Sequence, residues 1–152
     1  MKTKTIHAER PVGIYSGFPI RFPFGMPGFP ELRRCELIYD KEELPFLWLQ
    51  ATEGCDFSFI VVEPWGLIPN YQMEMASEDA AFLGVENPDE LFLLNIVTVP
   101  SAVPRKITVN LVAPLAVNLH TGIGRQVILK NHRQLSTRHV LLDESDSTLV
   151  EI

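Results

Sequence analysis

Apolar and polar residues alternate with a period of two along much of the chain. In the segment 14–24, every second residue from Phe18 to Phe24 is apolar, which predicts a β-strand with one face against a core. Pro19 and Pro23 lie in the same segment, and proline cannot donate a hydrogen bond to a neighbouring strand. We therefore expect an edge strand or an interrupted strand here.

Further short strands are predicted where β-branched and aromatic residues gather between turn residues. The segment 91–99 is almost entirely apolar, which predicts a central strand buried on both faces. The alternation in 107–111 continues into 113–119 across Pro114, so these segments form one bent strand or two strands that meet at a bulge. The other expected strands are 34–39, 46–51, 57–63, 71–75, 126–130 and 138–142, with turns at 25–28, 53–56 and 122–124.

Two short helical segments are expected among the strands. Ser77 is a candidate N-cap, followed by Glu78 and Asp79 in the first turn and by Gly84 as the stop. The segment 87–90 reads Asn-Pro-Asp-Glu and places a proline at the first helical position, which opens a short helical turn.

Many short strands with turns about every 8–12 residues predict an all-β protein. We expect a compact closed β-barrel or sandwich of short antiparallel strands with one or two short helices. The 152 residues are the length of one ordinary domain. The expected organisation is a single domain over 1–142 and an acidic, frayed C-terminal tail over 143–152.

Charge is distributed unevenly along the sequence. The net charge is −6, but no Lys or Arg occurs between Lys41 and Arg105, and that stretch holds eleven acidic residues. A surface built from it would attract a basic partner and repel phosphate, which argues against direct binding of nucleic acid. The alternative is a solvated face that serves only solubility.

No pattern of a catalytic, metal or cofactor site stands out. Ser136, His139 and Asp143 are close in sequence, but no strained-turn motif surrounds the serine, so a surface turn is expected. The four histidines and two cysteines lack the spacing of a zinc site. No apolar run reaches the ~18 residues of a membrane span, and no signal peptide is expected. We expect a cytoplasmic binding protein with free thiols, no cofactor and no metal, rather than an enzyme.

Aromatic residues and methionines in loops rich in proline and glycine are candidates for partner anchors. Met26, Phe29 and Trp65 are expected at loop tips, with Trp65 reachable by solvent in an extended loop over 64–69.

Several stretches together resemble one protein family in order and spacing. The block from Asn110 to Asn118, followed by the block that starts at Gln126, is the most specific, and Leu135 departs from the aromatic residue that is frequent near that position. The chain resembles the flagellar assembly factor FliW family from about Tyr15 to Leu142, through the stretches 24–29, 45–50, 96–99, 108–114, 117–118, 126–129 and 137–141.

The resemblance implies a compact β-barrel-like cytoplasmic protein without enzymatic activity. It also implies binding to flagellin and to CsrA, a small RNA-binding translational repressor. Binding to CsrA would relieve repression of flagellin translation. Newly made flagellin would then bind the FliW-like protein and free CsrA again. This exchange would couple flagellin synthesis to export.

We hypothesise that the partner-binding surface combines acidic residues with aromatic residues beside them. Acidic side chains would give specificity and a fast on-rate toward a basic repressor, and apolar side chains would give affinity. The edge of the strand 18–24 is a candidate acceptor for a flagellin segment. The predicted surface consists of Glu74, Glu78, Asp79, Glu86, Asp89 and Glu90, with Trp65 and Tyr71 beside them.

Two other classes of protein remain as alternatives. A small-ligand-binding β-barrel carrier or enzyme would need convergent polar groups inside the barrel. An RNA-binding barrel would need basic and aromatic residues on one face, which the charge distribution disfavours.

Overall fold

The computed structural model describes residues 3–7, 17–54 and 56–145. Within them, eleven strands, one α-helix and two short 3₁₀ helices are present. The helical segments are α1 (Ser77–Leu83), η1 (Pro88–Glu90) and η2 (His132–Gln134). The strands are β1 (Thr3–His7), β2 (Phe18–Arg21), β3 (Arg34–Tyr39), β4 (Leu47–Ala51), β5 (Ser58–Val62), β6 (Gln72–Ala76), β7 (Leu91–Thr98), β8 (Lys106–Val109), β9 (Leu115–Asn118), β10 (Gly124–Gln126) and β11 (His139–Asp143).

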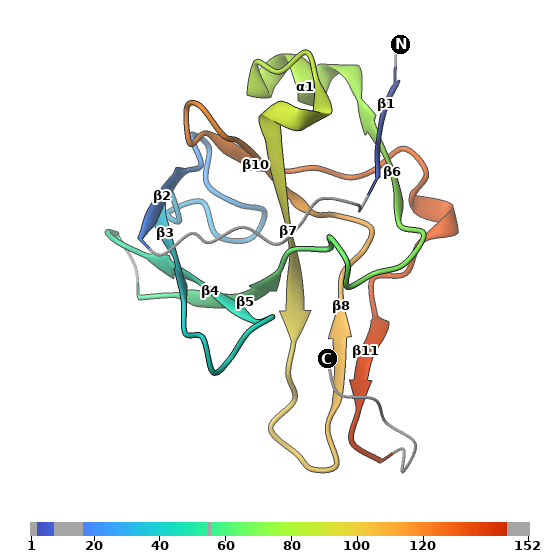
Figure 1. Cartoon of the computed structure of the whole chain (residues 1–152). Helices are drawn as coiled ribbons and strands as arrows, with labels where there is room; N and C mark the ends of the chain where they lie inside the picture. The colour runs from blue at the N-terminus through green and yellow to red at the C-terminus, as the bar shows by residue number, and fades with distance from the viewer. Residues whose placement is uncertain (1–2, 8–16, 55, 146–152) are drawn as a thin grey trace.

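Nine of these strands form one antiparallel sheet that curls nearly into a barrel (Figure 1). Its main path runs β10-β9-β7-β5-β4-β3-β2, and β8 and β11 extend from β7, while β1 pairs only with β6. The two ends of the path meet where the backbone N–H of Arg21 donates to the Gly122 carbonyl at 2.8 Å. A side chain at position 122 would lie 2.9 Å from the Pro19 carbonyl oxygen, and φ there is +72°, so this closure requires glycine.

The central strand β7 separates two hydrophobic cores. Phe92 and Leu94 pack in the barrel interior with residues of β2, β3 and β4. Leu91 and Leu93 pack on the other side, with residues of α1, β6 and β8. This two-sided burial confirms the strand expected at 91–99 and explains its nearly continuous apolar sequence.

Most of the expected architecture is confirmed. The strands expected at 34–39, 46–51, 57–63, 71–75 and 138–142 correspond to β3, β4, β5, β6 and β11, with small differences at their ends. The expected fold class, a mostly β protein with a nearly closed antiparallel sheet and short helices, is also confirmed.

Local hydrogen bonding explains two differences in the second half of the chain. The segment 107–119 forms two strands because the Asn110 side chain accepts backbone hydrogen bonds from Val112 and Ala113, which turns the chain there. The strand expected at 126–130 is wrong, since β10 ends at Gln126. Residues 127 and 129 still donate backbone hydrogen bonds to the carbonyls of Pro114 and Val112, but without a regular ladder.

Three further differences concern β2, β1 and the start of α1. The strand expected over 14–24 is shorter, since β2 covers Phe18–Arg21, and 14–16 lie outside the described residues. Strand β1 was not expected. The expectation that Ser77 caps α1 is wrong because β6 runs directly into the helix, so Ala76 holds the extended N-cap backbone without a side-chain bond.

The first two residues of the expected frayed tail, Asp143 and Glu144, are held by β8 and by the residue that precedes it. Asp143 ends β11, opposite Lys106 of β8. The Glu144 carboxylate receives hydrogen bonds from the Arg105 guanidinium at 3.1 and 2.8 Å, which lowers the pKa of Glu144. Residues 146–152 of the expected tail lie outside the described residues.

Candidate functional site

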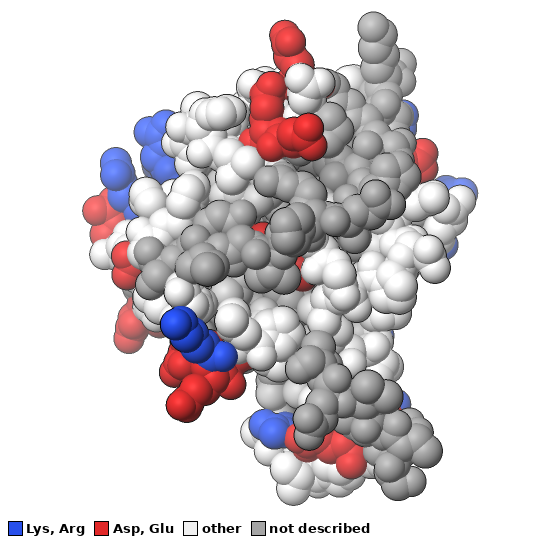
Figure 2. Space-filling view, viewed as in Figure 1, with Lys and Arg blue, Asp and Glu red and all other residues white. Residues whose placement is uncertain are grey.

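The acidic residues between Lys41 and Arg105 do not form one continuous surface. Figure 2 shows acidic side chains in separate groups, one over α1 at the top of the view and another at the lower left, over the loop that follows β3. Glu63 is not on the surface, because only 2% of it is exposed. On this face the acidic residues of the stretch thus lie in more than one group, and one of these groups is at α1.

The six acidic residues predicted for the site differ in exposure. Glu78, Glu86 and Asp89 are exposed, and Glu90 and Glu74 are half-buried. Asp79 is 9% exposed. The exposed carboxylates therefore belong to α1 and to the segment 86–89 that precedes β7.

Three of the four predicted apolar and aromatic anchors are core residues. Trp65 is only 2% exposed, so the expected solvent-reachable position is wrong, and Met26 and Tyr71 are buried as well. The Tyr71 hydroxyl donates to the Leu111 carbonyl and accepts from the Asn95 side chain, and burial raises the pKa of Tyr71. In this structure, these three side chains cannot reach a partner.

Phe29, the fourth predicted anchor, is half-buried in an aromatic cluster. Its ring centre lies 4.9 Å from that of Phe57 and 5.5 Å from that of Phe59, both in edge-on geometry. These contacts hold the loop that precedes β3 against β5 and against the turn that precedes β5. Phe29 therefore stabilises a loop, and partner contact through it stays a prediction.

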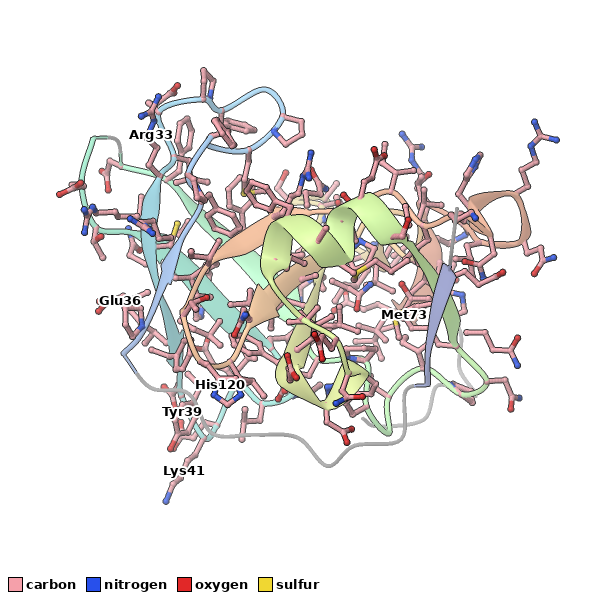
Figure 3. The ribbon with its side chains drawn as sticks, turned by 90° about the horizontal axis from the view of Figure 1, so that it is seen from above. Arg33, Glu36, Tyr39, Lys41, Met73 and His120 are labelled. Carbon is pink, nitrogen blue, oxygen red and sulfur yellow. The ribbon has the colours of Figure 1, made fainter. Side chains whose placement is uncertain are left out.

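Helix α1 is short and is held at its C-terminal end. Gly84 adopts the left-handed conformation that ends the helix, and its N–H donates to the Ala81 carbonyl. The Asn118 side chain, from the end of β9, donates to the Leu83 carbonyl at 2.7 Å. Figure 3, viewed from above, shows α1 lying between β3, which carries Glu36, and β6, which carries Met73.

An aromatic and ionic stack covers one side of α1. The Asp79 carboxylate lies 3.4 Å from the Arg125 guanidinium, whose central carbon lies 4.6 Å from the centre of the Phe82 ring. The Phe24 ring centre lies 5.9 Å from that of Phe82. Phe24 is 79% exposed and is the most exposed large apolar side chain among the described residues. An aromatic residue and an acidic helix thus share one surface.

The loop that presents Phe24 is tightly folded. The backbones of Met26 and Phe29 exchange two hydrogen bonds, at 3.1 and 2.8 Å, around Pro27 and Gly28. A side chain at Gly25 would lie 2.4 Å from the Pro30 carbonyl oxygen, so the chain can pass there only with glycine. A groove of about 570 Å³ lies between this loop, Phe82 and Arg125.

The alternation along 18–24 predicts that Phe24 lies on the core side, and the predicted anchors do not include it. The strand ends at Arg21, so the period of two no longer applies at Phe24. Pro23 before Phe24 and Gly25 after it are the signals in the sequence that mark this change of direction.

Asp79→Asn is expected to change the pH dependence of stability. Burial raises the pKa of Asp79 above its ordinary value of 3.8, Arg125 opposes this, and Glu78 adds to it. The folded protein therefore binds the proton more tightly than the unfolded chain, and ionisation of Asp79 reduces stability as the pH rises above about 3.8. Urea denaturation at increasing pH above this value should show that the wild type loses stability relative to the variant. A difference between the wild type and Asp79→Asn that does not change with pH would contradict the argument.

No group of three or more His, Cys, Asp or Glu side chains is arranged to hold a metal ion in the part of the chain that the structure describes. None of the helices described here has the length and apolar character needed to cross a membrane. The barrel interior is filled by side chains such as Phe22, Leu37 and Phe92, which leaves the small-ligand alternative without support.

Comparison with known proteins identifies relatives over most of the chain. The family model described as FliW protein matches residues 7–141. The flagellar assembly factor FliW of Desulfitobacterium hafniense (strain DSM 10664 / DCB-2) is 41% identical over 130 residues, which cover 84% of this chain and 83% of that protein. The flagellar assembly factor FliW of Thermosipho africanus (strain TCF52B) is 38% identical over 114 residues, covering 75% and 79%.

A solved structure agrees with the sequence relatives. The crystal structure of a flagellar assembly factor FliW matches with a TM-score of 0.72 at 29% sequence identity, and the match covers 91% of this chain and 96% of that chain. On the strength of the sequence matches, the shared fold and the extent of both, the chain belongs to the FliW family of flagellar assembly factors.

Proposed function

We propose that this flagellar assembly factor acts by binding flagellin and a CsrA-type RNA-binding repressor in the cytoplasm, without catalysis. When the assembly factor binds the repressor, the repressor no longer blocks translation of flagellin. Newly made flagellin then displaces the repressor from the assembly factor. The observation that carries the proposal is the surface at α1, where the exposed ring of Phe24 packs against Phe82 of the helix that also carries the exposed Glu78. The relatives bear the name of an assembly factor, not of an enzyme.

The charges of this surface suit a partner that normally holds RNA. A protein that binds phosphates presents Lys and Arg, and exposed carboxylates attract those groups and repel RNA. Such exposed pairs contribute more to the on-rate and to specificity than to affinity. Glu78 and Asp89 are the best-placed carboxylates, because both are exposed whereas Asp79 is already paired with Arg125.

Affinity would come from the aromatic side chains. An exposed ring held by a rigid loop loses little conformational freedom on binding, which is typical of residues that dominate an interface. The predicted contact set therefore changes: Phe24 and Phe82 replace the buried Trp65, Tyr71 and Met26.

Flagellin was expected to add to the edge of the strand 18–24, and that edge is partly occupied. The backbone N–H of Arg21 donates to the Gly122 carbonyl at 2.8 Å, and Arg21 forms a bridge with Ile123 on that side of β2. We propose instead that flagellin reaches the α1 surface, which would explain how it displaces the repressor.

Charge reversal at α1 tests the proposal. Glu78→Lys together with Asp89→Lys should weaken binding of the CsrA-type protein from the same genome by about tenfold at low ionic strength, and less at high ionic strength, because salt screens exposed charges. Isothermal titration calorimetry of the full chains measures this. The matched control, Glu31→Lys with Asp56→Lys, makes the same charge change on exposed residues outside α1 and should alter affinity less than twofold.

The contribution of the Phe24 side chain to affinity is measured in the same calorimetry experiment. Phe24→Ala should weaken binding by about tenfold or more at any ionic strength, since a central anchor contributes about 2 kcal/mol. Stability should not change, because Phe24 is 79% exposed, and Ile128→Ala is the matched control for loss of an exposed apolar side chain. Unchanged affinity in both arms would overturn the assignment of this surface.

A further inference from the structure

A second groove lies far from α1 on the molecule. It has a volume of about 540 Å³ and is bounded by the loop between β3 and β4 and by strands β8 and β11. Figure 1 shows these elements at the end of the molecule opposite α1. The groove is therefore separate from the surface proposed to bind the repressor.

The floor of this groove is apolar and firmly supported. Its side chains are half-buried, except for Ile107, which is buried, and several of them also pack against the core that β7 shares with α1 and β6. Leu44, at the rim, is 41% exposed. The apolar residues of the floor are Phe46, Trp48, Ile60, Val99, Ile107 and Leu142.

The charged groups around the groove leave it negative. Glu42 and Glu43 line it from the β3–β4 loop, and both are exposed. Glu43 accepts a hydrogen bond from the Trp48 indole N–H at 3.2 Å, which holds one carboxylate over the apolar floor. The cation on the other side, Arg105, is paired with Glu144 at 2.8 Å. An occupant therefore meets apolar surface next to carboxylates whose charge is not neutralised by Arg105.

We infer that this groove is a second docking site, which accepts an apolar segment flanked by Lys or Arg from a protein partner. The inference rests on the proposed function, since the partner belongs to the same flagellar system. A small-molecule site would bring several polar groups to converge on the ligand, whereas here the carboxylates lie on one side and Arg105 is engaged.

Charge disfavours the two occupants that this chain itself could supply. A second copy of the chain carries a net charge of −6, so it would approach with the wrong sign. The segment 146–152 contains Asp146 and Glu151 but no Lys or Arg. A basic partner segment is the occupant that complements the groove.

The test uses overlapping peptides that cover the flagellin and the CsrA-type repressor of the same genome. Binding of each fluorescently labelled peptide to the full chain is measured by anisotropy. We expect the peptides that bind to combine apolar residues with Lys or Arg. The substitution Leu44→Arg should weaken the binding of these peptides by about tenfold or more. Ile128→Arg, the same change at another exposed apolar residue, should leave binding within twofold. Tryptophan emission should shift to shorter wavelength on binding, because Trp48 lies in the groove and Trp65 is buried.

Several outcomes would overturn the inference. These are no peptide binding, binding that Leu44→Arg leaves intact, or preference for acidic peptides. Sedimentation that shows a dimer abolished by Leu44→Arg would assign the groove to a second copy, and a gain of peptide affinity on deletion of 146–152 would assign it to that segment. None of these results depends on Glu78, Asp89 or Phe24, so failure here is distinguishable from failure of the proposed function.

Discussion

Replacing Phe92 with alanine is expected to lower the free energy of unfolding by about 4 kcal/mol. Phe92 lies in the middle of the barrel core with none of its surface exposed. Its ring centre is 5.2 Å from that of Phe18 on β2, in edge-on geometry, so it joins the central strand to the strand at the end of the sheet. Truncation would leave a cavity and remove this contact.

Urea denaturation followed by circular dichroism measures the effect. Because domains of this size are stable by only about 5–15 kcal/mol, the alanine variant could fail to fold, and Phe92→Leu provides a milder change with an expected loss of about 1.5 kcal/mol. Phe57→Ala is a control at an aromatic residue that is 40% exposed and should cost about 1 kcal/mol. A loss for Phe92→Ala no greater than that for Phe57→Ala would show that the barrel interior is not the main core.

The sequence predicted this core well because buried strands carry strong local patterns. The run 91–99 is apolar throughout most of its length, and the structure shows why: consecutive residues of β7 face two different cores. Alternation likewise located β3, β4 and β5, each with one face toward the interior. In these segments local preference and the tertiary fold agree.

The closure of the barrel could not be predicted from such patterns. It depends on the contact of Arg21 with Gly122, residues about a hundred positions apart, and on the space that a glycine leaves beside Pro19. Strand β1 was also missed, since Thr3–His7 has no apolar run and forms a strand only by pairing with β6. Both features come from long-range pairing that a single sequence does not display.

The candidate site was predicted only in part, for two physical reasons. Charge in the sequence does not specify exposure, and Glu63 and Asp79 turned out to be buried while Glu78 and Asp89 are exposed. Aromatic residues near turns do not reveal which way they point, so Trp65 is a core residue whereas Phe24 is the exposed one. The charge count predicts a basic partner, which stays a prediction, and the fold shows which of these carboxylates are exposed.

Asn118→Ala is expected to lower the free energy of unfolding by about 3 kcal/mol, because this buried side chain satisfies three backbone groups at once. Its amide donates to the Leu83 carbonyl at 2.7 Å, and its oxygen accepts from the N–H groups of His120 and Thr121 at 2.8 and 3.3 Å. The side chain thus joins the last turn of α1 to the turn that closes the barrel. Alanine would leave the buried Leu83 carbonyl without this donor and would remove the acceptor shared by the two N–H groups of the turn.

Two further variants separate the functions of the Asn118 side chain. Asn118→Asp keeps an acceptor for the two N–H groups but places a carboxylate against the Leu83 carbonyl, so it should loosen α1 while preserving the turn. Hydrogen exchange should then rise in 77–83 and not in 120–123. Asn110→Ala, at a half-buried asparagine whose oxygen accepts from Val112 and Ala113, should cost less, about 1.5 kcal/mol. Equal losses at the two asparagines, or exchange that rises only in the turn, would mean that α1 and its acidic surface are positioned by packing alone.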